Sequence, residues 1–474
     1  MLPTPENYAL FPSVVQANTP TEMTIVPREK AFLFVENKEY TLTLIPVNGD
    51  EIKYRSTDTP ETHKKMTVTA HNGILRFTYA FPNEQEHTIL LHCEEVLLQT
   101  FTAFSLYEDL YRLRPMKGDF HGHSYRSDGR RDPAALAGHY REQGYDFFSL
   151  TDHNRYYPGG EVDETYRGVK TAFFRVLGEE IHAPEIPVHI VRIGEGKSVT
   201  EEYVHNFESY MHETDEYIKR VPAEIPAQYV ERYAKIMWAT DKIHAAGGIA
   251  IFPHPFWRPG KSKVFNVCDE FATILLKSGM FDAYELIGGM GQEGNNRSVA
   301  FWADLRAEGL KIPVVGSSDV HKIEKSVEFP HLFTICFAEE ATPEATIAAV
   351  KAGLSVAVEG TGTEYERHHR AYGSLRLVTY TQFLLKHFFT KIQRIAHGEG
   401  VAMRAYAIGE APKELIEMQA VQAEQFRAQF FGRIAPTLPT TEALDFEERW
   451  REIHRNGPQT KGSSIMTPPV TIQI

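Results

Sequence analysis

The sequence contains few cysteines and no long apolar segment. Its 474 residues include three cysteines, Cys93, Cys268 and Cys336, which are too few for a disulfide framework. No apolar run approaches the roughly 18 residues that a membrane-spanning helix needs. The amino-terminal residues lack the basic stretch and following apolar stretch of a secretory signal. From these features we expect a cytoplasmic protein that does not enter a membrane.

An excess of basic residues is also missing. Lys and Arg total 50 and Asp and Glu total 63, which gives a net charge of −13 with neutral histidine. This balance gives no strong signal for nucleic-acid or anionic-membrane binding, although it is compatible with a local basic pocket. The 33 glycines and 27 prolines are too few for a fibrous or disordered chain. Histidine stands out instead, with 21 residues, many of them beside Asp, Gly or Pro where apolar runs end.

The order of the predicted elements divides the chain into three parts. Residues 1–112 contain short β-branched and aromatic runs, with an Asn72-Gly73 hairpin signal, and predict an all-β, sandwich-like domain. Residues 113–365 alternate apolar strands with helices, which indicates parallel βα units in an α/β barrel or a doubly wound sheet. Residues 366–474 predict a helical carboxy-terminal extension that ends in a loose tail.

Histidine and acidic side chains gather where the predicted strands of the middle part end. His121 and His123 follow one strand, and Asp319 and His321 follow another. Residues i and i+2 of an extended chain point to the same side, so each pair can direct both side chains at one centre. The ends of parallel strands meet at one edge of a sheet, where α/β proteins form their active sites. Similar residues at or near strand ends are Asp128, Asp152, His153, Glu179, Glu180, His189 and His254.

A shared metal site explains this pattern more simply than a series of unrelated structural histidines. Imidazole and carboxylate ligands suit Zn, Mn or Fe, and the absence of cysteine from the set argues against a structural zinc site. These candidate ligands are too many for one ion. We therefore expect two to three divalent metal ions that share a bridging carboxylate, an arrangement suited to generating hydroxide at neutral pH and to phosphoryl displacement.

Six motifs resemble the signature of the PHP (polymerase and histidinol phosphatase) family of metal-dependent phosphoesterases. They are HGHSYRSDG, TDHN, GEE, VHIV, PHP and GSSDVH, in this order, and they fall within residues 115–360. The resemblance implies a distorted seven-stranded β/α barrel with up to three metal ions in a cleft. It implies His121, His123 and Asp319 as ligands of one ion, Glu180 as the bridge, His189 and His254 at the second ion, and Asp128, His153 and His321 at the third.

Two of these positions have a competing neighbour. The Gly178-Glu179-Glu180 motif offers two carboxylates, and the spacing of the family selects Glu180 with Glu179 as the fallback. His182 competes with His189, which lies in the matching His-Ile-Val context.

The candidate substrate contacts are arginines close to the motifs, because a guanidinium group matches phosphate oxygens in a bidentate manner. Arg258 is favoured since it lies near His254, while Arg126, Arg130 and Arg297 are alternatives. An alternative role for each of the four arginines is a surface charge that is solvated or paired with an acidic residue. Aromatic residues that could stack on a base or a sugar, or simply pack, are Tyr125, Tyr156, Tyr157, Phe256 and Trp257.

Together these features predict an enzyme, a PHP-type phosphoesterase that hydrolyses a small phosphate ester such as a nucleotide or sugar phosphate by a metal-bound hydroxide. Arg258 would stabilise developing charge, and His321 or His153 would protonate the leaving oxygen if metal binding leaves either free. One alternative is an amidohydrolase-like hydrolase of a C–N or C–O bond, although no Lys is positioned for the carbamate bridge of many such enzymes. The other alternative is a non-catalytic, metal-containing sensor or binding module.

Overall fold

The computed structural model describes residues 6–48, 63–184, 186, 188–260, 262–324, 326–362 and 367–456. The chain divides into two compact units. We call Met1–Arg112 together with Gln425–Ile474 the β unit, and Leu113–Glu424 the barrel unit. Most of the loose tail predicted at the carboxy terminus, from residue 457 onward, lies outside the described residues.

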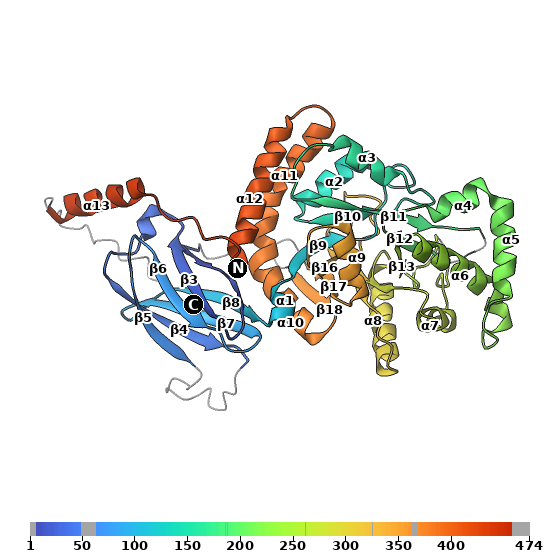
Figure 1. Ribbon diagram of the computed structural model, residues 1–474, viewed down its shortest axis with the longest axis horizontal. Helices are drawn as coiled ribbons and strands as arrows, with labels where there is room; N and C mark the ends of the chain where they lie inside the picture. Colours follow the sequence, from blue (N-terminus) through green and yellow to red (C-terminus); the bar gives the residue numbers. More distant parts are fainter. Residues whose placement is uncertain are drawn as a thin grey trace. The chain divides into compact units, whose positions relative to one another are not determined.

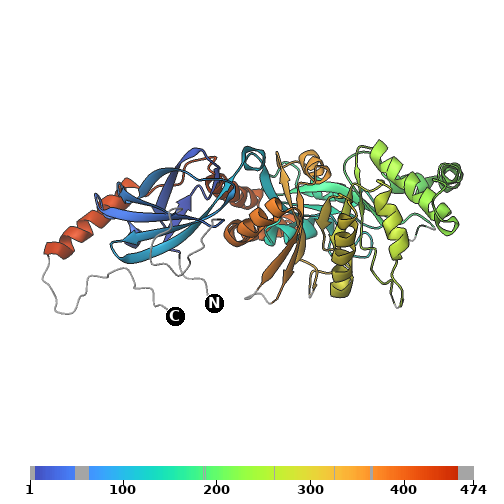
Figure 2. The ribbon, with the colours of Figure 1, turned by 90° about the horizontal axis from the view of Figure 1, so that it is seen from below.

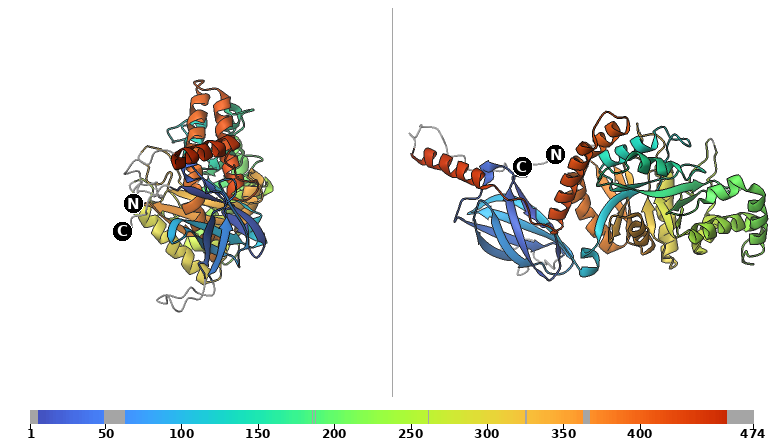
Figure 3. Two further views of the ribbon diagram at one scale, coloured as in Figure 1. Left: turned by 90° about the vertical axis from the view of Figure 1, so that its left-hand side faces the viewer. Right: turned by 45° about the horizontal axis from the view of Figure 1, so that its top comes forward.

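The β unit is built from two sheets that share one core. Its strands are β1 (Tyr8–Phe11), β2 (Val14–Gln16), β3 (Pro20–Pro27), β4 (Glu39–Pro46), β5 (Lys64–Thr69), β6 (Leu75–Ala80), β7 (Gln85–Cys93) and β8 (Val96–Leu106). One sheet has the order β1-β3-β6 and the other has the order β2-β8-β7-β4-β5. Met23 and Ile25 from the first sheet pack with Leu42 and Ile89 from the second, and all four are buried. Figure 3 shows these strands, coloured blue, in two orientations.

The Asn72-Gly73 turn forms as its sequence predicts, but it does not close a hairpin. Asn72 has φ 53° and Gly73 has φ 71°, the left-handed backbone that favours this residue pair, and His71 forms a bridge with Ile74. The flanking strands then separate, because β5 pairs with β4 while β6 pairs with β3. The turn therefore connects the two sheets of the β unit.

The barrel unit contains a mixed sheet of ten strands. They are β9 (Arg114–Asp119), β10 (Phe147–Leu150), β11 (Phe174–Ile181), β12 (Ile190–Ile193), β13 (Ile249–Phe252), β14 (Ala283–Ile287), β15 (Val314–Gly316), β16 (Leu332–Ala338), β17 (Ser355–Thr361) and β18 (His368–Tyr372). The order is β15-β14-β13-β12-β11-β10-β9-β16-β17-β18. The resemblance implies seven strands, and the ladder connects ten because β16, β17 and β18 extend it.

The strand directions differ from the all-parallel expectation at two places. β9, β10 and β11 run parallel, as do β13, β14 and β15, but β12 is antiparallel to both of its neighbours. The connection from Ile181 to Ile190 is too short for a parallel crossover, so the chain folds back directly. β16 is likewise antiparallel to β9 and to β17, and β17 is antiparallel to β18.

Side-chain hydrogen bonds join the first strand of this order, β15, to β16 and β17 near its other end. The amide of Gly316 in β15 donates to Thr334 Oγ1 of β16 at 3.0 Å, and the same hydroxyl donates to the Gly316 carbonyl at 2.8 Å. Ser355 Oγ of β17 donates to the carbonyl of Val314 at 2.8 Å. The sheet is therefore a nearly closed barrel.

Helices surround the barrel or extend from it. They are α2 (Pro133–Glu142), α3 (Pro158–Thr165), α4 (Val199–His205), α5 (Phe207–Ile218), α6 (Val230–Ala245), α7 (Asp269–Lys277), α8 (Gly291–Ala307), α9 (Pro343–Lys351), α10 (Leu375–Leu384), the π-helix η3 (Leu385–Phe389) and α11 (Thr390–Ala407). Asp132 caps α2 by accepting from the amide of Ala135 at 2.9 Å, as its sequence predicts. In Figure 1 and Figure 2, α4, α5 and α6 lie together at one end of the barrel unit.

Two further helices follow toward the carboxy terminus, α12 (Lys413–Phe430) and α13 (Thr441–Asn456). α13 belongs to the β unit, where Arg451 donates to the carbonyl of Leu33 at 3.1 Å. Among the described residues, no helix combines the length and the apolar character that crossing a bilayer requires.

Candidate metal centre

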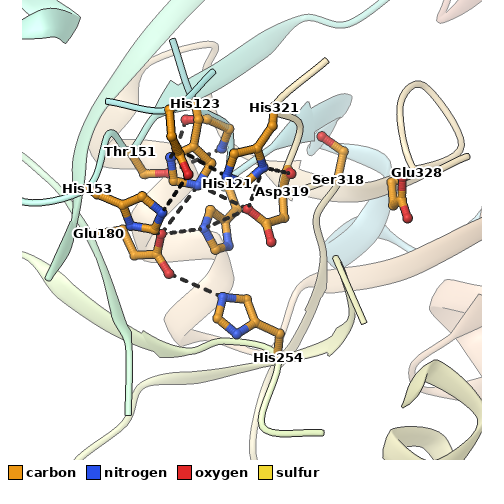
Figure 4. Close-up of polar contacts among 12 residues, drawn as sticks. His121, His123, Thr151, His153, Glu180, His254, Ser318, Asp319, His321 and Glu328 are labelled. Atoms are coloured by element: carbon orange, nitrogen blue, oxygen red, sulfur yellow. Dashed lines mark hydrogen bonds and ion pairs between the residues drawn. The ribbon is translucent and has the colours of Figure 1, made fainter. Parts of the chain in front are cut away.

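The predicted ligands come from six strands and meet at one edge of the barrel. His121 and His123 follow β9, His153 follows β10, and Glu180 lies near the end of β11. His254 follows β13, and Asp319 and His321 follow β15. His189 directly precedes β12, and because β12 is antiparallel, its start lies at the edge where β11 and β13 end. Figure 4 shows Glu180 and Asp319 surrounded by histidine rings.

One oxygen of Glu180 faces three histidines. Its Oε2 atom lies 3.3 Å from His121 Nε2, 3.3 Å from His123 Nε2 and 2.9 Å from His153 Nδ1. The carboxylate is fully buried. Burial opposes its ionisation, yet the nearby histidines, His121 foremost, hold the pKa of Glu180 well below its usual range. This oxygen is thus a negative charge shared by several imidazoles.

The other oxygen of Glu180 faces a different pair of histidines. Its Oε1 atom lies 2.7 Å from His189 Nδ1 and 3.2 Å from His254 Nε2. His182, the competitor of His189, is also present, with ring centroids 3.4 Å apart. Burial lowers the pKa of His182 to about 3, so its ring is neutral and able to accept. The structure brings both histidines to the centre, and the choice between them as ligands stays open.

Asp319 supplies a second carboxylate on the inner side. Its Oδ1 atom lies 3.0 Å from His123 Nε2 and 3.4 Å from His121 Nε2. Asp319 has φ 51° and His254 has φ 25°, left-handed backbone values that cost energy for residues other than glycine. A Cβ atom at Gly289 would collide with the Asp319 carboxylate, so the chain approaches closely here. The backbone is therefore strained where two candidate ligands are presented.

Asp128, His153 and His321 form an outer group at the exposed side. Asp128 Oδ1 lies 3.2 Å from His321 Nε2, and Asp128 Oδ2 lies 3.6 Å from His153 Nε2. Burial disfavours the charged ring of His153, but the nearby carboxylates of Asp128 and Glu180 raise the pKa of His153 to about 10. With His123, this group offers four ligand atoms within 4.8 Å of one another.

The donor set fits metal ions, as shown by buried polar atoms that lack hydrogen bonds. An unpaired buried nitrogen or oxygen is costly unless something else binds it. Three-ligand groups with mutually close donor atoms are His121, His123 and Asp319; His121, Glu180 and His254; and His153, Glu180 and His182. The unsatisfied atoms of the centre, among the described residues, are His121 Nε2, His123 Nδ1, His153 Nδ1, Glu180 Oε2, His182 Nε2 and His254 Nδ1.

Glu285 is a buried residue of the centre that lies outside the sequence motifs. Its Oε2 atom lies 2.9 Å from His121 Nδ1, and its Oε1 atom accepts from the amide of His254 at 3.3 Å. A carboxylate on the outer nitrogen orients an imidazole ligand and increases its basicity. The sequence signal for Glu285 is an acidic residue within the otherwise apolar strand β14. A buried strand position is normally apolar, so a charged residue there indicates a functional contact.

Two aspartates hold the loops that carry the ligands. Asp119 accepts from the amide of His121 at 3.0 Å and from the hydroxyl of Tyr140 at 2.9 Å. Asp152 accepts from the amide of Ser124 at 2.8 Å and from the hydroxyl of Ser127 at 2.6 Å. Asp152 therefore fixes the turn that leads to Asp128, although its sequence position also made it a ligand candidate.

Glu179 does not reach the centre. Its carboxylate lies 3.1 Å from the Arg192 guanidinium and accepts from Ser198 Oγ at 2.7 Å. It also accepts from the amides of Val199 at 2.9 Å and Thr200 at 3.3 Å, the first residues of α4. The fallback ligand of the GEE motif is thus an ion-paired residue that anchors a helix.

The centre opens into a cavity of about 620 Å³. Among the described lining residues, the only lysine is Lys322, which is exposed, and the only tryptophan is Trp257. The lining residues are Asp128, His153, Glu180, His182, His189, His254, Trp257, Gly289, Asp319, His321, Lys322, Glu324, Ser326, Val327 and Glu328.

The structure does not bring Arg258 to the centre, in contrast to its predicted role. Its side chain is 44% exposed, pairs with Glu293 at 3.0 Å and lies over the ring of Phe265. The backbone after His254 carries Trp257 into the cavity instead, which directs the next side chain away. Arg258 is therefore close to His254 in the sequence but does not line the cavity of the centre.

The alternative arginines also point elsewhere. Arg126 pairs with Glu161 at 2.8 Å, and Arg297 pairs with Asp269. Arg130 is exposed, and its backbone amide donates to the His321 carbonyl at 3.0 Å. Of the five aromatic candidates, Trp257 lines the cavity; those outside its described lining are Tyr125, Tyr156, Tyr157 and Phe256.

Comparisons with known proteins give partial structural similarity. No family model matches the sequence, and no curated protein matches it. A two-domain protein of Bacteroides vulgatus with a predicted PHP-like metal-dependent phosphoesterase domain is 20% identical, with a TM-score of 0.38, over 52% of this chain and 66% of its own. A proposed metal-dependent phosphoesterase of Bifidobacterium adolescentis is 17% identical, with a TM-score of 0.31, over 43% and 87%.

An amidohydrolase of Chromobacterium violaceum, solved with sulfate and no metal, is 17% identical, with a TM-score of 0.30, over 44% of this chain and 89% of its own. The chain is thus similar to solved PHP-like structures, the family that its motifs resemble. At these TM-scores the similarity does not identify a reaction, so the site must be interpreted from its own geometry.

Proposed function

We propose that this protein is a metal-dependent phosphoesterase that hydrolyses a small phosphate ester, such as a nucleotide or a sugar phosphate. The observation that carries the proposal is the position of Glu180. One of its oxygens faces His121, His123 and His153, while the other faces His189 and His254. A carboxylate that joins two sets of imidazoles in this way is suited to hold two ions side by side.

The side chains of the centre divide into an inner and an outer group. His121, His123 and Asp319 would hold one ion, and Glu180 with His189 and His254 would hold a second. Asp128, His153 and His321 would hold a third ion at the exposed side. When bound, divalent ions would supply Lewis acidity and activated water, the requirements of ester hydrolysis.

The remaining lining residues suit binding and proton transfer. Lys322 is a cation placed next to His321 at the cavity, and it is suited to approach a phosphate oxygen. His321 or His153, whose pKa values are raised, would protonate the leaving oxygen if metal binding leaves either free. Trp257 offers an apolar surface on which a base or sugar can rest.

An amidohydrolase-like reaction is the second candidate, because a multinuclear centre also suits attack on a carbonyl group. The structure favours the phosphoesterase, since Lys322, the lysine of the described cavity lining, is exposed on the loop after His321. A lysine that bridges two ions as a carbamate would need to be buried between them.

The test is a substrate panel with the full chain after loading with Mn or Zn. Phosphomonoesters, phosphodiesters, lactones and amides are compared, before and after chelation. We expect chelator-sensitive turnover of a phosphate ester. Turnover of lactones or amides alone would establish the amidohydrolase alternative, and metal binding without turnover of any class would establish a non-catalytic module.

A further inference from the structure

The barrel unit contains a second cavity, of about 960 Å³, which lies apart from the metal centre and whose lining includes one lysine and two arginines. We call it the basic cavity. It shares no described lining residue with the metal cavity. Its lining residues are Lys117, Glu142, Gln143, Pro330, His331, Phe333, Arg367, His369, Thr390, Gln393, Arg394 and His397.

Lys117 reaches this cavity because of its position in β9. Its neighbour Met116 and nearby Phe120 pack in the barrel core, so Lys117 projects from the opposite face of the strand. The ammonium group lies 4.1 Å from the ring centroid of Tyr145 and 4.5 Å from that of Phe333. It donates to the carbonyl of Gln143 at 2.9 Å. Burial lowers the pKa of the Lys117 amino group to about 7, although nearby Asp146 and Asp119 oppose this. A carbonyl and two aromatic faces hold the group, and a bound anion would favour its charged form.

No carboxylate among the described residues forms an ion pair with Lys117 or with Arg394, which α11 contributes to the same cavity. Glu142 is the one carboxylate of the described lining, and it is engaged elsewhere. Its Oε1 atom accepts from Arg404 Nε at 3.1 Å, and its Oε2 atom lies 3.2 Å from His139. Glu142 therefore forms no ion pair with Lys117 or Arg394.

Two histidines of the cavity are neutral, and one of them has an open hydrogen-bonding position. Burial, together with Arg367 and Lys117, lowers the pKa of both His331 and His369 to about 4. The buried His331 Nδ1 atom has no hydrogen bond within the described part of the chain. An unpaired buried nitrogen close to Lys117 is the kind of position that a bound ligand satisfies.

We propose that the basic cavity binds a phosphate-type oxyanion, either free or carried by a small molecule, at a site separate from the metal centre. The cations approach from several elements: Lys117 from β9, Arg367 before β18 and Arg394 from α11. A tetrahedral oxyanion presents oxygens in several directions, whereas a carboxylate presents two in one plane. Guanidinium groups also match pairs of phosphate oxygens.

The location is tested with crystals of the metal-loaded protein soaked in selenate, an anomalous scatterer with the shape and charge of sulfate. We expect an anomalous peak between Lys117, Arg367 and Arg394, whether or not selenate also occupies the metal centre. Absence of a peak in the basic cavity, at a concentration that places selenate anywhere else on the molecule, would overturn the proposal.

The affinity is tested by equilibrium dialysis of the metal-loaded full chain with radiolabelled inorganic phosphate. Arg394→Gln changes an exposed residue and should not impair folding. It should weaken one class of phosphate sites by roughly tenfold or more, because a charge-assisted hydrogen bond is lost. The matched control is Arg306→Gln, an exposed arginine of α8 outside the cavity, which should change nothing. Equal phosphate binding by both variants contradicts the proposal.

Two further measurements test whether phosphate binds at this cavity and whether the site prefers phosphate to carboxylates. Lys117→Met should abolish the same class of sites, and circular dichroism establishes that the variant is folded. If Lys117→Met does not fold, the comparison of Arg394→Gln with Arg306→Gln decides. Succinate, a dicarboxylate, should compete with phosphate at this site only weakly. Competition by succinate as strong as that by phosphate itself would show that the site takes carboxylates and that its assigned chemistry is wrong.

Discussion

Glu179 and Glu180 are neighbours in β11 whose carboxylates point to opposite sides of the strand. Glu180 lies among the histidines of the metal centre, and Glu179 pairs with Arg192 at 3.1 Å and holds the start of α4. Successive side chains of a β-strand point to opposite faces, so the two carboxylates must lie on different sides of β11. One motif thus supplies a candidate bridging ligand and a structural ion pair.

The two glutamates should therefore respond differently to the same substitution. Glu180→Gln keeps the size but removes the charge, and we expect loss of at least one metal ion and of most turnover. Glu179→Gln removes one partner of a buried ion pair and should lower the free energy of unfolding by roughly 3 kcal/mol while metal content is retained. Elemental analysis and urea unfolding of both variants check this, and metal loss confined to Glu179→Gln would reverse the assignment.

Glu285 should set the metal affinity without acting as a ligand. Glu285→Gln weakens the contact with His121 Nδ1, now 2.9 Å, and should reduce metal affinity by roughly 10- to 100-fold. Competition with a chromophoric chelator measures the change. Glu293→Gln, an exposed glutamate that pairs with Arg258, is the control and should leave affinity unaltered. Equal metal affinities of the two variants would show that Glu285 does not influence metal binding.

Lys322, not Arg258, should contribute to phosphate binding. Arg258→Ala disrupts a surface pair with Glu293 and should leave kcat/KM for a phosphomonoester unchanged. Lys322→Ala removes the lysine that lines the cavity and should lower kcat/KM by roughly tenfold, which is about 1.4 kcal/mol of transition-state stabilisation. Steady-state kinetics of the two variants decide. A loss in Arg258→Ala alone would mean that the loop after His254 rearranges when substrate binds.

A buried histidine in the β unit predicts how stability depends on pH. Burial lowers the pKa of His87 from 6.5 to about 4. The unfolded chain therefore binds more protons than the folded one between these values, so stability falls as pH decreases through this window. The contribution lost between pH 7 and pH 5 is about 2 kcal/mol. Urea unfolding at both pH values should show this decrease in the wild type and a smaller one in His87→Gln.

Local spacing predicted much of the centre, because the ligand motifs depend on short-range geometry. The i and i+2 pairs and the strand ends bring His121, His123, Asp319 and His321 together as expected. The direction of β12 was not predictable from its composition, since a short apolar run is the same in a parallel or an antiparallel ladder. The length of the connection before it was the relevant signal.

What the sequence could not provide are relationships between distant segments. Glu285 contacts His121 across 164 positions, and Arg258 is near His254 in sequence but pairs with Glu293 on another element. The helical residues 441–456 return to the β unit, where Arg451 bonds to Leu33. Helical spacing indicates an apolar face, but it does not identify the partner that the face contacts.

Glu180 and the surrounding histidines should hold more than one metal ion, and elemental analysis of the purified full chain measures this. After dialysis against Mn or Zn and removal of free metal, we predict two to three ions per chain, reduced by at least one in Glu180→Gln. A wild-type protein that retains no metal, and whose activity and stability do not respond to added Mn or Zn, would contradict the account.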